Sequence, residues 1–203
     1  MIKTFAKPVL AAVAVAAIMA ACTQQEADKT TADAGAAVNA AQDATSTAVG
    51  QTSAAVLGAN TVGGFVSSLA VSDMYELEAA KIAATKSTNA DVKALAAMIT
   101  KDHTASSAKL KELAPTAAPT VAIPTTMDER RQGLIDNLNA ATPADFNKVF
   151  LTQQVAAHDE ALTLLNGFDD NTEAPTLAAM AKDLIPKITM HRERAEDLLD
   201  AMD

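Results

Sequence analysis

Four stretches of the chain repeat apolar residues at intervals of three and four, which is the period of one buried face of an α-helix. These stretches predict four long helices, over residues 65–86, 90–114, 142–167 and 173–202. After residue 64 glycine occurs only at Gly133 and Gly167, and so glycine-poor a stretch argues against an all-β fold with many tight turns. The pattern therefore predicts an all-α domain over residues 64–203.

The predicted ends of these helices follow from capping residues and prolines. Asn89 is a favourable N-cap for the second helix, and Pro115 is expected to end it, because proline lacks the N–H that an interior position donates. Thr142 and Pro143 predict the start of the third helix, as its cap and its first helical residue. Pro186 lies inside the fourth helix and predicts a kink there.

A proline-rich spacer, residues 115–126, separates the second and third helices, and a short helix is predicted after it over residues 127–140. At about 3.1 Å per residue the spacer would cover roughly 37 Å, close to the roughly 36 Å of a helix of about 24 residues. It can therefore return the chain along the whole bundle, so that the second and third long helices run parallel. We expect a ferritin-like four-helix bundle with a long crossover, because an up-down-up-down bundle normally needs only short loops.

The first 22 residues have the organisation of a bacterial export signal. Lys3 and Lys7 precede an apolar run over residues 9–21, which spans roughly 20 Å and is too short for a bilayer core of roughly 30 Å. The run ends in the sequence MAAC, which resembles a lipobox, and Cys22 is the only cysteine of the chain. We expect Cys22 to be lipidated after cleavage, and an ordinary cleaved signal peptide is the alternative.

The segment that follows, residues 23–63, has too few large apolar side chains to fold alone and predicts a flexible tether, or a transient helix over residues 34–57. With the lipid anchor, the expected location is the bacterial cell envelope, facing the periplasm, with the membrane as partner. Thr23, where Asp would resemble an inner-membrane retention signal, favours the outer membrane. The net charge is −9 without any Lys/Arg cluster, which excludes a nucleic-acid-binding surface.

Each of the three histidines lies on the apolar stripe of a different predicted helix, His103 on the second, His158 on the third and His191 on the fourth. The first helix offers Glu76 on its stripe, with Glu78 as the rival carboxylate. In the crossover topology the helical rise puts the histidines and Glu76 roughly 17–22 Å below the same end of the bundle, whereas His191 would lie roughly 30 Å down in an up-down-up-down bundle. The predicted layer and the predicted crossover therefore depend on each other.

One carboxylate and three imidazoles are ligand types that bind a divalent transition metal such as Zn, Fe, Cu or Mn. The alternative is three core histidines that hydrogen-bond to one another, to Glu76 or to water. A di-iron centre is not expected, since Thr100 and Ile188 stand where its Glu-x-x-His motifs need Glu. Three acidic residues adjoin the histidines and are expected to be solvated, or at most to be outer partners of the ligands: Asp102, Asp159 and Glu160.

Parts of the chain resemble the bacterial domain-of-unknown-function family 4142. The resemblance is carried by SDMYELEAAKIAATKSTNADVKALAAMITKDHT at residues 72–104 and by the histidine-bearing sequences VAAHDEALTLL and DLIPKITMHRERAEDLL. It covers about residues 65–200 and implies a ferritin-like fold and an envelope location. It also implies that the polar positions recurring in the family are Glu76, His103, His158 and His191.

Two classes of function remain, since the family resemblance implies no established activity. In the first, the domain is an envelope metal-binding module that uses the histidine layer. In the second, it is an anchored structural or interaction protein without site chemistry. No catalytic residue is predicted, because no nucleophile constellation and no phosphate-binding loop occurs in the sequence.

Overall fold

The computed structural model describes residues 61–202, and Cys22 and nearly all of the predicted tether lie outside them. The described chain forms α-helices and no strand, which confirms the all-α class. None of the described helices is both long enough and apolar enough to cross a membrane. The helices are α2 (Val62–Lys86), α3 (Ala90–Ala117), α4 (Glu129–Ala140), α5 (Phe146–Asn166) and α6 (Pro175–Asp200).

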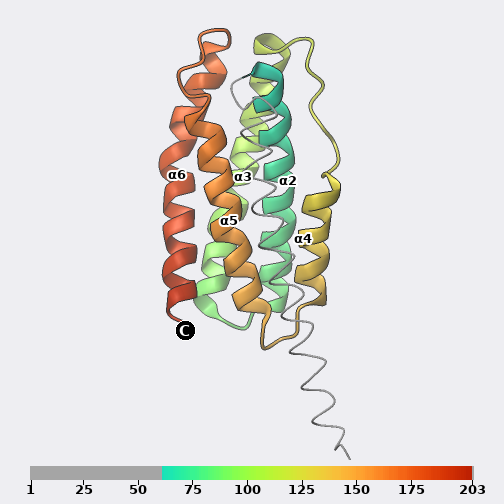
Figure 1. Cartoon of the computed structure of the whole chain (residues 1–203), viewed down its shortest axis with the longest axis vertical. Coiled ribbons are helices and arrows are strands. Elements are labelled where there is room, and N and C mark those ends of the chain that lie inside the picture. The colour runs from blue at the N-terminus through green and yellow to red at the C-terminus, as the bar shows by residue number, and fades with distance from the viewer. Residues whose placement is uncertain (1–60, 203) are drawn as a thin grey trace, which may run out of the picture.

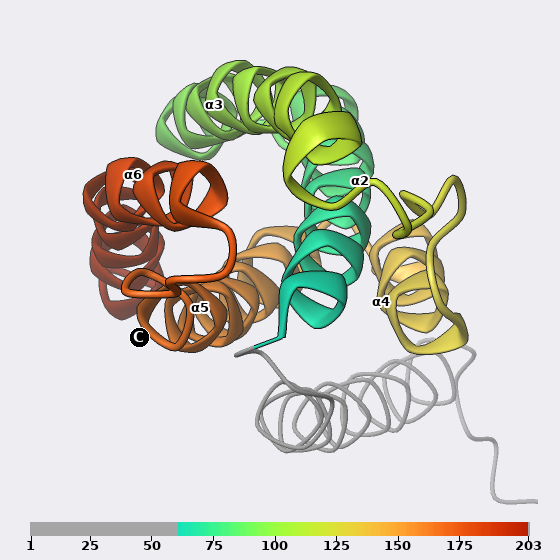
Figure 2. The same cartoon turned by 90° about the horizontal axis from the view of Figure 1, so that it is seen from above.

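Four long helices, α2, α3, α5 and α6, lie side by side, and the short α4 lies against α2 and α5 (Figures 1 and 2). In the view of Figure 1, α2 descends and α3 ascends. The connection after α3 then passes down the outer side of the molecule to α4, which also descends. Because α5 starts at the lower end and ascends, α3 and α5 run in the same direction, and α6 returns beside α5.

The second long helix, α3, begins as predicted but ends later than predicted. The Asn89 side chain accepts hydrogen bonds from the backbone N–H groups of Asp91 at 2.8 Å and Val92 at 3.2 Å, so Asn89 is the N-cap. The helix continues through Pro115 to Ala117, and the prediction that Pro115 ends it is wrong. In the last turn the proline removes only one ladder bond, and burial of Ala114 on the same turn holds that turn in place.

The spacer is consequently shifted toward the C-terminus, with nearly the predicted number of residues. The non-helical connection spans residues 118–128 rather than 115–126, and Figure 1 shows it beside only the upper part of α2. The lower part is covered by α4, which continues in the same direction. The connection and α4 together therefore run along the length of the bundle, which the sequence analysis expected an extended coil to span alone.

Two other helix starts lie later than the sequence predicted, for one physical reason. Thr142 and Asn171 cap short turns rather than helices: Thr142 Oγ1 accepts from the Asp145 N–H at 3.3 Å, and Asn171 Oδ1 accepts from the Glu173 and Ala174 N–H groups at 3.0 Å. Such side-chain turns use the same residue types as N-caps. The following helices then begin at Phe146 and Pro175, and α6 continues through Pro186 to Asp200.

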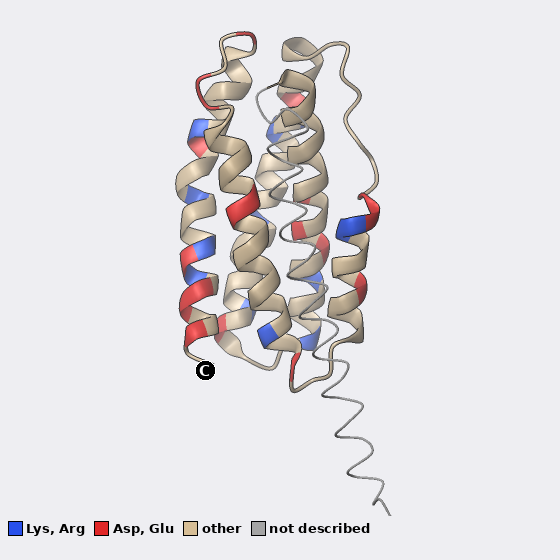
Figure 3. Ribbon diagram, in the orientation of Figure 1, with Lys and Arg blue, Asp and Glu red and all other residues tan. Residues whose placement is uncertain are grey.

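Side chains at both ends of α4 attach it to the long helices. Arg130 and Arg131, in its first turn, both donate to the Glu160 carboxylate of α5, at 2.8–2.9 Å. Figure 3 shows this turn as the place where charges of both signs meet on α4. At the other end, Lys86 Nζ donates to three backbone carbonyls of the α4 C-terminus, those of Leu138, Asn139 and Ala141. A cation there matches the negative end of the helix dipole.

The core consists of two apolar clusters stacked along the bundle. The lower cluster gathers the C-terminal half of α2, the first turns of α3, α4, the start of α5 and the end of α6. The upper cluster gathers the start of α2, the end of α3, the end of α5 and the first half of α6. In each long helix the change from one cluster to the other falls on buried polar residues. We call these residues the polar layer: Asp73 and Glu76 on α2, His103 and Ser106 on α3, Gln154 and His158 on α5, and His191 on α6.

Candidate metal centre

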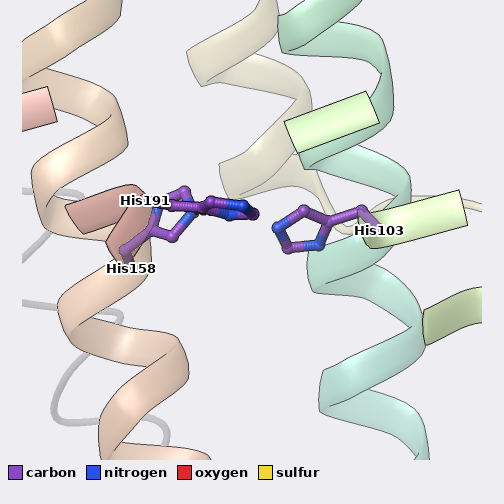
Figure 4. A group of neighbouring side chains, drawn as sticks. All are labelled: His103, His158 and His191. Carbon is purple, nitrogen blue, oxygen red and sulfur yellow. Dashed lines mark hydrogen bonds between the residues drawn. The ribbon is translucent and has the colours of Figure 1, made fainter. Parts of the chain in front are cut away.

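The three histidines, which lie far apart in the sequence, meet in the middle of the bundle. One ring nitrogen of each of His103, His158 and His191 lies within 4.8 Å of the corresponding nitrogens of the other two. The His158 Nε2 and His191 Nδ1 atoms are the closest pair, 3.3 Å apart. Figure 4 shows the His103 ring approaching the other two rings from the opposite side of the bundle. All three side chains are buried, with exposed fractions of 3 %, 1 % and 0 %.

The other ring nitrogen of each histidine, here called the outer nitrogen, is bound to an oxygen of a neighbouring residue. His103 Nδ1 lies 2.8 Å from Asp73 Oδ1, and His191 Nε2 lies 3.1 Å from Asp102 Oδ2. His158 Nδ1 lies 2.8 Å from the backbone carbonyl of Gln154, one turn earlier on α5. Carbonyls and ionised carboxylates only accept hydrogen bonds, so the outer nitrogens are the donors. These contacts fix both the tautomer and the orientation of each ring.

The inner nitrogens, His103 Nε2, His158 Nε2 and His191 Nδ1, therefore carry lone pairs in the neutral rings. His103 Nε2 is buried without a hydrogen-bond partner among the described residues. The inner nitrogens of His158 and His191 face each other at 3.3 Å, and two acceptors at that separation repel each other unless a proton or a cation lies between them. Outer anchoring by carboxylate or carbonyl oxygen, with the second nitrogen free, is the pattern of metal-ligating histidines in proteins.

The spacing of the inner nitrogens fits the dimensions of a metal site. Bonds of about 2.0–2.1 Å in a tetrahedral arrangement separate adjacent nitrogen ligands by about 3.3–3.4 Å. His158 and His191 already have this spacing. Since all three nitrogens lie within 4.8 Å of one another, a shift of about 1 Å by the His103 ring would complete a three-nitrogen site.

Burial and neighbouring charges shift the pKa values of the three imidazoles in different directions. Burial holds the pKa of His158 well below its usual range, and the neighbouring His103 and His191 lower it further. Burial and His103 also lower the pKa of His191, against the opposing effect of Asp102. For His103 burial is again the largest single influence, but the hydrogen bond to Asp73 and the charges of Glu76, Asp73 and Asp102 outweigh it and raise its pKa. The lowered pKa values of His158 and His191 favour neutral rings that can ligate, whereas the raised pKa of His103 means that metal and proton compete for its inner nitrogen.

The predicted carboxylate ligand, Glu76, lies beside the histidine group rather than among the converging atoms. Its Oε1 is 3.8 Å from His158 Nδ1, an outer nitrogen, and its Oε2 is buried without a hydrogen-bond partner. Burial raises the pKa of Glu76 to about 7, although the nearby His103 lowers it. The rival Glu78 lies at the surface, where it pairs with Lys81 at 3.1 Å.

The carboxylates that do contact the imidazoles are Asp73 and Asp102. Asp73 was not singled out from the sequence, although it lies three residues before Glu76 on the same buried face of α2, a spacing that the helical period could have flagged. Its second oxygen accepts a hydrogen bond from Ser107 Oγ at 3.1 Å, which fixes the carboxylate. Asp102 follows the expectation of an outer partner, but it holds His191 of another helix rather than its sequence neighbour His103.

The two other acidic neighbours of the histidines point away from them. Asp159 pairs with Arg192 of α6, and Glu160 pairs with the α4 arginines. Gln154 also escaped the sequence analysis: its side chain is fully buried in the polar layer, and neither of its amide atoms has a hydrogen-bond partner among the described residues. Together with Glu76 Oε2 and His103 Nε2, these atoms give the centre of the bundle a polar interior.

Comparison with known proteins identifies the family of this chain. No curated protein and no solved structure matches it. A family model described as a domain of unknown function, DUF4142, matches residues 46–198 and so includes every residue of the polar layer. The chain therefore belongs to the DUF4142 family.

Proposed function

We propose that this chain is an envelope-anchored protein whose helical domain binds one divalent transition-metal ion through His103, His158 and His191. The observation that carries the proposal is the convergence of three inner nitrogens whose rings are all anchored from outside. Core histidines that served packing alone would pair these nitrogens with donors. Here two of them face each other as acceptors, and the third has no partner among the described residues.

The charges around the site favour a dication. Two buried carboxylates, Asp73 and Glu76, and the half-buried Asp102 lie around the three imidazoles. Burial raises the pKa of Glu76 to about 7, so without metal this carboxyl takes up a proton near neutral pH, and a bound dication would favour its ionised form. Buried charges are costly unless they are compensated, so a bound dication would stabilise the folded chain.

Among the candidate metals, the nitrogen-only ligand set favours Zn²⁺ and Cu²⁺. Imidazole suits zinc, copper and iron, whereas manganese prefers carboxylate and water oxygen, and the carboxylates here contact the outer nitrogens. Three nitrogens leave at least one coordination position for an outside ligand. Glu76, the carboxylate that the sequence analysis assigned to the site, would need another rotamer to reach that position, because its Oε1 lies 3.8 Å from an outer nitrogen, His158 Nδ1.

The test is metal titration of the full-length chain after treatment with a chelator. We expect one Zn²⁺ per chain by calorimetry. We also expect a rise in unfolding free energy of about 2.7 kcal/mol when free metal exceeds its Kd a hundredfold. Co²⁺ in the same site should give the intense visible absorption of a tetrahedral ion.

The His103→Gln variant should keep its helical circular dichroism and lose most of the melting shift caused by metal. A wild-type chain whose melting temperature does not respond to Zn, Fe, Cu or Mn would overturn the metal proposal and favour the structural or interaction role. A shift of equal size in the His103→Gln chain would overturn the site assignment.

The remaining parts of the proposal concern the anchor and the architecture. We propose that the lipidated Cys22 holds the domain at the periplasmic face of the outer membrane, on the tether predicted over residues 23–63, whose last two residues, Val62 and Gly63, belong to α2. The sequence of the export signal supports this. We further propose that the bundle is the ferritin-like type with a crossover, a reading supported by the parallel course of α3 and α5 in Figure 1.

A further inference from the structure

Of the side chains in polar contact with the three histidines, only Asp102 reaches the surface of the described bundle. Its side chain is 16 % exposed, and its Oδ2 lies 3.1 Å from His191 Nε2. Asp73, which contacts His103, and Glu76, the other buried carboxylate of the polar layer, are each 1 % exposed. The contact between Asp102 and His191 therefore links the histidine centre to solvent.

This contact lies where α3 adjoins α6, just below a groove of about 470 Å³ between the same two helices (Figure 2). Ser106 of α3 and Lys187 of α6 line the groove. Ser106 follows Asp102 by four residues and Lys187 precedes His191 by four, so the groove begins about one helical turn above the contact. A water molecule takes up about 30 Å³ of the liquid, so the groove has room for a metal ion with its hydration shell.

Side chains of neighbouring helices bridge the other three sides of the polar layer. The bridges join Arg192 of α6 to Asp159 of α5, Arg130 and Arg131 of α4 to Glu160 of α5, and Ser107 of α3 to Asp73 of α2. Two of these bridges are ion pairs, whose carboxylates are already neutralised by guanidinium groups, and the third lies on the buried Asp73. Asp102, by contrast, has no arginine or lysine partner among the described residues. Its negative charge can therefore attract a cation from the groove.

From this arrangement we propose that Asp102 is the entry point of the metal ion that His103, His158 and His191 bind. The inference rests on the proposed function and names the route to the same site. A hydrated dication from the groove binds the Asp102 carboxylate, which then no longer accepts the hydrogen bond from His191 Nε2. The His191 ring is thereby released and turns to bring its Nδ1 lone pair to the ion.

The inner side of the ring does not oppose this turn. In the metal-free chain His191 Nδ1 faces a second acceptor, His158 Nε2, so the turn breaks no hydrogen bond there. The ring then carries the ion to the other two inner nitrogens, and Asp102 again accepts from Nε2, which keeps its proton throughout.

The experiment separates the rate of metal entry from the strength of binding. Co²⁺ uptake by the full-length, chelator-treated chain is followed by its visible absorption after rapid mixing, and competition with a chelator gives the Kd. Asp102→Asn should lower the association rate constant about tenfold, because it removes the charge that attracts the ion. Asp102→Glu, which keeps the carboxylate, should stay within about twofold of the wild type.

Asp73→Asn is the matched control, since it makes the same change at the buried anchor of His103. It should weaken Co²⁺ binding mainly through faster dissociation and leave the association rate constant within about twofold of the wild type. An equal fall of the association rate constant in Asp73→Asn and Asp102→Asn would overturn the proposal, because Asp102 would then act only as an anchor.

Lys187 gives a second test that leaves every histidine contact intact. Lys187→Met removes a positive charge from the groove and should raise the association rate constant about twofold. Lys182→Met makes the same change of net charge at an exposed lysine of α6 that does not line the groove, and it should have a smaller effect. Equal rate constants in the two lysine variants would contradict entry from the groove.

These outcomes differ from a failure of the proposed function. A wild-type chain that gives no Co²⁺ absorption and no melting shift with any of the metals would overturn metal binding itself, and the entry route with it. A wild type that binds Co²⁺, with an unchanged association rate constant in Asp102→Asn, would overturn the entry route alone.

Discussion

At the scale of single residues, the chemistry of the polar layer depends on which nitrogen of each histidine is anchored. The anchors are of two kinds, the carboxylates Asp73 and Asp102 and one backbone carbonyl of α5. A carboxylate can be changed by mutation, whereas the carbonyl cannot. The carboxylates therefore offer the sharpest tests of the tautomers on which metal binding depends.

Asp102→Asn should weaken Zn²⁺ binding by about 10- to 100-fold, the usual cost of altering an outer partner of a metal ligand. The amide can donate to His191 Nε2, which moves the ring proton to Nδ1, the inner nitrogen. Asp159→Asn is the matched control, because Asp159 also adjoins a histidine in sequence but pairs with Arg192. Competition with a chromophoric chelator measures both affinities. Equal Kd values for the two variants would contradict the assigned tautomer.

Because Glu76 is buried, we expect the metal-free chain to become less stable as pH rises. Its pKa is about 7 in the folded chain, against 4.5 as the ordinary value, so the folded state binds this proton more tightly than the unfolded state does. The stabilisation is complete below about pH 4.5 and is lost as pH rises through 7, to a total of about 3 kcal/mol.

Urea unfolding of Glu76→Gln and of the wild type, both without metal, measures this loss. Between about pH 4.5 and pH 8 the free-energy difference should move by about 3 kcal/mol in favour of the glutamine variant. A difference that stays constant over this range would mean that the carboxyl titrates at its ordinary value.

At the scale of elements, α4 is the part of the fold that depends most on charged contacts. It is short, and its first turn is attached to α5 through Glu160, whose side chain is 14 % exposed, and through Arg130 and Arg131, at 18 % and 11 %. Both guanidinium groups are partly buried, so the ionised Glu160 carboxylate stabilises them, and Arg131 also pairs with Asp128 at 2.7 Å. The apolar face of α4, which joins the lower cluster, completes the attachment.

Glu160→Gln should therefore destabilise the chain by about 2 kcal/mol, because it removes the carboxylate that two partly buried guanidinium groups share, although Arg131 keeps its contact with Asp128. Glu78→Gln removes an equally simple pair, with Lys81, but this pair is exposed at the surface of α2 and should cost at most about 0.5 kcal/mol. Chemical denaturation compares the two variants, and limited proteolysis at residues 118–128 reports whether α4 has detached. Equal costs for the two substitutions would show that α4 is held by its apolar face alone.

At the scale of the whole molecule, two apolar clusters enclose the polar layer from above and below. Metal, water and protons can therefore reach the histidines only between helices, past groups such as the half-buried Asp102. The proposed lipid anchor would add a second large-scale property, because the domain would then act only within reach of its tether. For a tether of about 40 residues that behaved as a flexible coil, the end-to-end distance would be roughly 35 Å.

The anchor is tested on intact cells. Labelling with an alkyne analogue of palmitate should mark the wild-type chain, because Cys22 is the only thiol of the sequence. Cys22→Ser should abolish the label, and Thr23→Ser, a conservative substitution at the neighbouring residue, should leave it. Unlabelled wild-type protein, free in the periplasm, would instead support an ordinary cleaved signal peptide.

The sequence alone determined the elements of this protein and the residues that face inward. Apolar periodicity is a local property of each helix, so it identified the long helices and placed His103, His158 and His191 on buried faces. The signals for helix ends were wrong at Pro115 and Thr142 and at the start of the fourth helix, where Asn171 closes a turn, because prolines and capping residues act in the same way in a turn and at a helix end. Packing against the rest of the fold decided whether each of these residues lies in a turn or at a helix end.

The tertiary structure decided what the inward-facing groups contact. Asp102 adjoins His103 in sequence but lies against His191, and Glu76 shares the polar layer without joining the converging nitrogens. Helical period gives the face and the approximate height of a side chain, but not its rotamer or the identity of its partner on another helix. The anchored tautomers, and with them the case for a metal, depend on distances of a few ångströms between helices, and only the folded chain sets these distances.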